Sequence, residues 1–193
     1  VTAALLLAAF WGLRMLWARL TGRPVAPWVM GVDPRAAWRA TTARSGWGQR
    51  RVPTGRYVRV AAAGLFSCAL TTSGRPVCWG NNRFGQATVT AAGYRQVSAG
   101  TVHACAVTID GVGVCWGSDS YGRASVPAGR YTQVSAGFRH SCAITTDGRG
   151  VCWGSNAQGQ RAVPAGRYTQ ISAGYGNSCA VRTDGQALCW GSN

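Results

Sequence analysis

The sequence contains no lysine and no glutamate: all 20 basic residues are arginine, and the five acidic residues are aspartate. The formal net charge is +15. Ten arginines and one aspartate lie before residue 60 (10 − 1 = +9), and ten arginines and four aspartates follow it (10 − 4 = +6). A nucleic-acid-binding surface needs clustered charge, which this distribution does not provide. The composition favours a dispersed basic surface, so a nucleic-acid partner is not expected.

The sequence also lacks an apolar run long enough to span a bilayer. Residues 1–13 are apolar, but Arg14 and Arg19 interrupt the run before it reaches the roughly 20 residues that a membrane helix needs. No basic stretch precedes the run, and no clear cleavage site follows it. We expect residues 1–45 to be an apolar, then irregular leader: either a remnant of a signal or anchor, or mistranslated upstream sequence. Membrane contact is expected only through this segment.

From Gly46 onward the chain repeats itself every 37 residues. Two cysteines recur in each repeat with ten residues between them, and a Trp-Gly pair follows the second one. These pairs are Cys68 and Cys78, Cys105 and Cys115, Cys142 and Cys152, and Cys179 and Cys189. A strict period of this length indicates a repeat architecture, and residues 46–193 hold four repeats.

Each repeat is predicted to form three short strands, at residues 131–136, 141–146 and 150–154 in the third full copy. The TDG sequence between the last two strands is typical of a three-residue hairpin loop with glycine in the left-handed conformation. Counting back from this loop places Cys142 opposite Cys152 at a non-hydrogen-bonded pair, where Cα atoms approach to about 4.5 Å. A disulfide can bridge that gap.

The eight cysteines are therefore expected to form four disulfides within hairpins, which indicates an oxidising compartment and an extracellular or cell-surface location. Zinc binding is the alternative, but zinc ligands commonly lie two to four residues apart rather than ten. No metal site is predicted.

Alternation along the strands places Cys142 and Ile144 on one face of the hairpin and Ala143 and Val151 on the other. Both faces are thus apolar or small, as expected for a sheet buried between two neighbouring sheets. This pattern predicts an all-β fold. It favours a β-propeller of short, 37-residue blades over a parallel β-helix.

Residues 136–166, AGFRHSCAITTDGRGVCWGSNAQGQRAVPAG, resemble the repeat of the regulator-of-chromosome-condensation family, in particular its bacterial branch with short repeats. The resemblance implies a ring of seven blades, of which this chain would supply about four. The sequence stops directly after the third strand of a blade, so a fragment truncated at the C-terminus is expected. A complete four-bladed ring is the alternative.

Strand direction predicts that two loops of each repeat meet on one rim of the propeller, and these loops differ between copies while the scaffold positions repeat. The divergent positions carry aromatic, apolar and arginine side chains typical of protein interfaces. The candidate partner-binding residues are Trp47, Leu65, Phe84, Tyr121, Phe138, Arg139 and Tyr175.

No catalytic constellation is evident, and no cofactor is expected. His103 and His140 hold equivalent positions, where the other copies have Phe66 and Asn177, so a structural hydrogen-bonding role is predicted. The first hypothesis is a non-enzymatic, secreted or surface-displayed module that binds a protein. The alternatives are an intracellular regulator of the guanine-nucleotide-exchange type and the sensor region of a larger, membrane-anchored enzyme.

Overall fold

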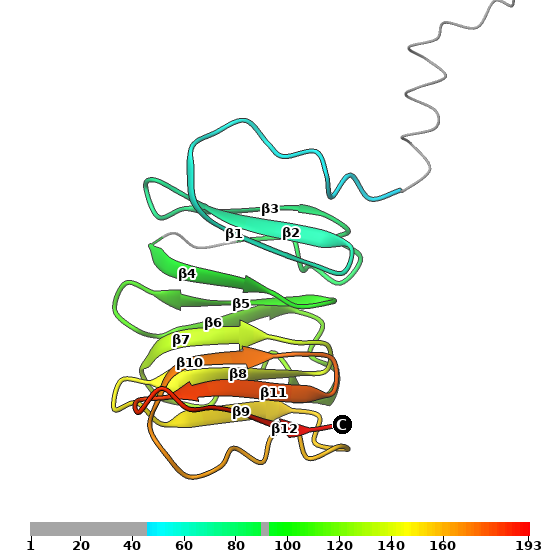
Figure 1. The fold of residues 1–193 in the computed structure, drawn as a ribbon. Helices are drawn as coiled ribbons and strands as arrows, with labels where there is room; N and C mark the ends of the chain where they lie inside the picture. The colour runs from blue at the N-terminus through cyan, green and yellow to red at the C-terminus, as the bar shows by residue number, and fades with distance from the viewer. Residues whose placement is uncertain (1–45, 90–92) are drawn as a thin grey trace, which may run out of the picture. The chain divides into compact units, whose positions relative to one another are not determined.

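The computed structural model describes residues 46–89 and 93–193, which fold into four three-stranded antiparallel sheets that follow one another along the chain (Figure 1). The first sheet contains β1 (Tyr57–Ala63), β2 (Phe66–Thr71) and β3 (Pro76–Gly80), and the second contains β4 (Tyr94–Ala99), β5 (His103–Thr108) and β6 (Gly113–Gly117). The third contains β7 (Tyr131–Ala136), β8 (His140–Thr145) and β9 (Gly150–Gly154), and the fourth β10 (Tyr168–Ala173), β11 (Asn177–Arg182) and β12 (Ala187–Gly191). The predicted leader, residues 1–45, lies outside the described residues.

The hairpin predicted around the TDG turn is confirmed. Thr145 N donates to Arg149 O at 2.9 Å, and Gly148 has a φ of +85°, the left-handed conformation that glycine adopts without a steric penalty. Cys142 pairs with Cys152 in the strand register, with their Cα atoms 4.0 Å apart. The same register recurs in every sheet. The structure contains disulfides Cys68–Cys78, Cys105–Cys115, Cys142–Cys152 and Cys179–Cys189.

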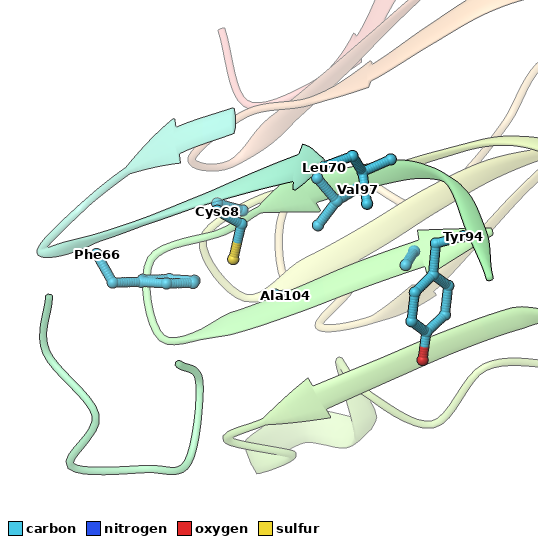
Figure 2. Close-up of a cluster of buried hydrophobic side chains, with 8 residues drawn as sticks. Phe66, Cys68, Leu70, Tyr94, Val97 and Ala104 are labelled. Carbon is cyan, nitrogen blue, oxygen red and sulfur yellow. The ribbon is translucent and has the colours of Figure 1, made fainter. Parts of the chain in front are cut away.

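The faces of adjacent sheets pack together through apolar side chains. In the first of these clusters, Phe66, Cys68 and Leu70 of β2 meet Tyr94 and Val97 of β4 (Figure 2). Two further clusters join the second sheet to the third and the third to the fourth in the same way. Both faces of a central sheet are therefore buried, as the sequence predicted.

Side chains of the first strands also bond adjacent sheets to one another. Gln133 of β7 donates from Nε2 to Ile171 O at 3.3 Å and accepts from Ile171 N at 3.0 Å, and Ser135 Oγ accepts from Ala173 N at 2.9 Å. Gln96 and Ser98 of β4 make the equivalent bonds to β7. These side chains replace the backbone ladder that two neighbouring but unpaired strands lack. We call each junction between adjacent sheets a seam; the side-chain bonds occur at the second and third seams, whereas β1 has Arg59 and Ala61 at the equivalent positions.

Helical structure within the described ranges consists of a single 3-10 turn, η2 (Ser120–Gly122). The residues that could be searched contain no helix with the length and apolar character needed to cross a membrane.

Candidate protein-binding rim

The two divergent loops of each repeat lie on the same rim, as predicted. One backbone hydrogen bond of 2.9 Å joins the loop after the first strand to the loop after the third strand in every sheet. These bonds are Asn81 N to Leu65 O, Ser118 N to Val102 O, Ser155 N to Arg139 O and Ser192 N to Gly176 O. We call the surface formed by these loops the rim.

The loop after the third strand has a fixed backbone built from a repeated side-chain contact. Asn82, Asp119 and Asn156 each accept a hydrogen bond from the backbone N–H five residues further on, at 2.7 to 2.9 Å. Asp119 also accepts from the Ser125 hydroxyl, and this bond is the main cause that lowers the pKa of its carboxyl group. The loop thus presents a variable residue on a constant frame.

Four of the predicted residues come together on the rim. The rings of Phe138 and Tyr175 stack with centroids 4.1 Å apart and planes 9° from parallel. The Arg139 guanidinium carbon lies 5.0 Å from the Phe138 ring centroid and 5.3 Å from that of Tyr121. Tyr121 and Tyr175 are 61% and 72% exposed. We call Tyr121, Phe138, Arg139 and Tyr175 the aromatic–arginine cluster; it spans loops of three sheets.

The remaining predicted residues lie apart from this cluster. Trp47, Leu65 and Phe84 are exposed, and the Arg83 guanidinium lies 6.0 Å from the Phe84 ring centroid. Within the described part of the chain, no aromatic or cation–π contact joins these three residues to the cluster.

Arg123 is a member of this surface that the sequence analysis did not single out. Its guanidinium carbon lies 5.7 Å from the Tyr121 ring centroid, and the residue is 5% exposed. Nε donates to Ser120 O at 2.8 Å and Nη1 to Phe138 O at 2.9 Å, so Arg123 ties two rim loops together. Burial, followed by the charge of Arg139, lowers the pKa of Arg123. The sequence does contain a signal that could have identified Arg123: the equivalent positions of two other repeats carry glutamine, Gln86 and Gln160.

The two histidines have the predicted structural hydrogen-bonding role. His103 Nε2 lies 2.8 Å from Ser141 Oγ across a seam, and this hydroxyl donates to Arg123 O at 2.9 Å. Because the serine hydrogen is used, the imidazole must donate from Nε2, which leaves Nδ1 unprotonated. His140 and Ser178 repeat the arrangement at 2.8 Å on the next seam. Burial lowers the pKa of His103 to about 3 and that of His140 to about 4.

These features define the class of protein: four small antiparallel sheets, joined face to face by seams, form a partial β-propeller with one loop-bearing rim. The family model described as the regulator of chromosome condensation (RCC1) repeat matches residues 57–86, 131–160 and 168–193. Three of the four repeats therefore match the RCC1 repeat, as the sequence resemblance implied.

Solved structures share this fold. The ectodomain of the receptor kinase CR4 from Physcomitrella patens is 28% identical, with a TM-score of 0.61 over 70% of this chain and 40% of that one. The CRINKLY WD40 ectodomain of the Arabidopsis thaliana receptor kinase ACR4 is 25% identical, with a TM-score of 0.60 over 70% and 51%. Prp20p of Saccharomyces cerevisiae is 19% identical, with a TM-score of 0.65 over 72% and 47%. The chain thus spans about half or less of each of these three structures, and no curated protein matches its sequence.

Proposed function

We propose that this chain is a non-enzymatic, protein-binding propeller module that holds its partner on the rim. The observation that carries the proposal is the aromatic–arginine cluster, in which Phe138, Tyr175, Tyr121 and Arg139 contact one another on the loops that vary between repeats. Tyrosine and arginine dominate the binding energy of protein interfaces, and clustered anchors are typical of their centres. Prp20p, with the same fold, is described with its binding to Gsp1p and histones and in a complex with Kap60.

We further propose that the module works outside the cytoplasm, secreted or displayed at the cell surface. The chain has four disulfides, each within one hairpin, and disulfides form and persist in oxidising compartments. An intracellular exchange regulator is less well supported, since it would keep these cysteines reduced.

A second candidate, the sensor region of a larger membrane-anchored enzyme, is favoured by a different observation. The two matched structures with 25% and 28% identity are both ectodomains of receptor kinases. Sequencing the coding region on both sides of this chain tests the candidate. An in-frame membrane segment and kinase domain would support it, and stop codons on both sides would contradict it.

The binding proposal is tested by selecting peptides from a random dodecapeptide display library on the full chain. Affinities of the enriched peptides, resynthesised with a fluorescent label, are then measured by anisotropy. The double variant Phe138→Ala/Tyr175→Ala should weaken binding at least about 100-fold, the effect of losing two interface anchors. Ile109→Ala removes an exposed apolar side chain from a β5–β6 turn, away from the rim, and should leave binding unchanged. Equal losses in both variants, or none in the double variant, would overturn the proposal.

A further inference from the structure

Two guanidinium groups converge on one exposed tyrosine ring without a carboxylate to pair with them. Arg123 and Arg139 lie 5.7 and 5.3 Å from the Tyr121 ring centroid. In residues 46–89 and 93–193, the only salt bridge is that of Arg149 with Asp147, at a turn after β8. Asp119 lies in the same loop as Tyr121, but its two oxygens accept hydrogen bonds from Ala124 N and Ser125 Oγ.

Arg123 is held in place with part of its guanidinium unused. Nε and Nη1 bond the carbonyls of Ser120 and Phe138, and Nη2 makes no hydrogen bond to a described residue. A rigid, nearly buried arginine with one free nitrogen loses little conformational entropy when it binds an anion.

The backbone at Tyr121 is strained, whereas the equivalent residues of the neighbouring repeats, Phe84 and Gln158, are not. With a φ of +69°, Tyr121 is the one non-glycine residue with positive φ in the described part of the chain. This conformation costs on the order of 1 to 2 kcal/mol for a side chain of this kind. Such outliers concentrate at binding sites. Tyr121 is also the residue whose ring lies near both guanidinium groups.

We propose, on the basis of the proposed rim function, that Arg123 and Arg139 bind the carboxylate of an aspartate or glutamate side chain of the protein partner. The aromatic stack of Phe138 and Tyr175 takes an adjacent apolar side chain of the same partner segment. An incoming carboxylate relieves the repulsion between the two arginines and accepts charge-assisted hydrogen bonds from them, while the surrounding rings exclude water and strengthen the attraction.

A nucleic acid is a poorer fit to the same groups. Phosphate-backbone recognition uses a track of basic side chains along the strand. Here Arg123 and Arg139 lie among the aromatic rings of the cluster. Arg83, another arginine of the rim loops, contacts Phe84 and makes no cation–π contact with the cluster within the described residues. One acidic side chain flanked by apolar groups matches this arrangement.

The test uses the peptides enriched on the full chain and, for each acidic one, a neutral twin with Asp replaced by Asn and Glu by Gln. Arg123→Gln restores the residue of the equivalent positions Gln86 and Gln160, and Arg139→Val restores that of Val102. Each variant should weaken the acidic peptide about ten-fold or more and leave the twin nearly unchanged, because the twin lacks the charge that they bind. Arg75→Gln removes one exposed charge in the turn after β2 and should alter neither affinity beyond about two-fold.

The outcomes separate this inference from the binding proposal. Peptides that need Phe138 and Tyr175 but bind equally as neutral twins, or that ignore both arginine variants, would overturn the carboxylate site and leave rim binding intact. If Arg75→Gln weakened binding as much as Arg123→Gln, the loss would be explained by the change in net charge, and the carboxylate site would also be overturned. Should Arg123→Gln fail to fold, Arg139→Val and the neutral twin decide the question without it.

Discussion

At the scale of single residues, the residues that face each other across the seams change together from seam to seam. His103 faces Ser141 and His140 faces Ser178, while on the first seam Phe66 and Ala104 pack in the same apolar cluster. Hydrogen-bonded and apolar pairs are both tolerated, since a buried donor without an acceptor is what destabilises a fold. The Phe66–Ala104 pair therefore shows which substitutions could replace a His–Ser pair without leaving an unpaired polar group.

The buried histidines predict a loss of stability in mild acid. In the unfolded chain both titrate near 6.5, whereas their folded pKa values are about 3 and about 4. Between these limits the unfolded chain binds protons that the folded chain does not. The free energy of unfolding is therefore at its full value above pH 6.5 and falls as the pH drops from 6.5 towards 4. Arg123, near His103, lowers that pKa further and Asp119 opposes it.

Carboxylate titration contributes mainly below this window, because the chain has no glutamate and hydrogen bonds lower the pKa values of Asp119 and Asp147. The measurement is the urea midpoint between pH 7 and 4.5. His103→Phe/Ser141→Ala, which copies Phe66 and Ala104, should remove about half of the pH dependence. An unchanged slope in this variant would show that other groups titrate.

At the scale of elements, the disulfide hairpin is the repeated unit, and its surroundings differ along the chain. Cys142 is fully buried and Cys152 nearly so, whereas Cys189 of the last sheet is exposed. Each bridge closes a loop of the same length, with a sequence separation of 10. The two bridges therefore restrict the unfolded chain equally, and their contributions to stability should differ only through the packing around them.

Replacing both cysteines of a bridge by alanine should cost roughly 2 to 3 kcal/mol in chain entropy for either bridge. Cys142→Ala/Cys152→Ala should cost more than Cys179→Ala/Cys189→Ala, because it also leaves a cavity between sheets. Urea unfolding of both variants measures the difference. Peptide mapping after alkylation without reductant provides the control: it should find four bridges, and eight alkylated thiols would contradict the disulfides themselves.

At the scale of the whole molecule, an apolar layer joins adjacent sheets at every seam, and glutamine and serine side chains add hydrogen bonds at the second and third seams. Gln133 contacts the backbone of β10 through both its amide oxygen and its amide nitrogen. Gln170 holds the same position on β10 but is exposed. The two glutamines are chemically identical, and only the packing of sheets distinguishes them.

Gln133→Ala should lower the free energy of unfolding by about 1 to 3 kcal/mol, because it leaves the Ile171 N–H without its partner. Gln170→Ala, the matched substitution, should change it by no more than about 0.5 kcal/mol. Chemical denaturation of the two variants side by side measures both values. Similar losses in both would mean that glutamine matters for the strand rather than for the seam.

The repeat period, the three strands of each unit and the facing cysteines could all be predicted from the sequence. Each depends on local spacing: the loop length sets the hairpin register, and the register sets which cysteines meet. The placement of Phe138 and Arg139 on the same rim as Tyr121 also followed from strand direction alone.

Only the tertiary structure decided which rim residues touch and what each polar side chain bonds. The stacking of Phe138 on Tyr175, the position of Arg123 beneath Tyr121 and the bond from Gln133 to Ile171 all cross from one repeat to another. Such contacts depend on how one sheet is set against the next. That arrangement results from the packing of many apolar side chains at once, whereas the order of residues within a repeat specifies its strands and turns.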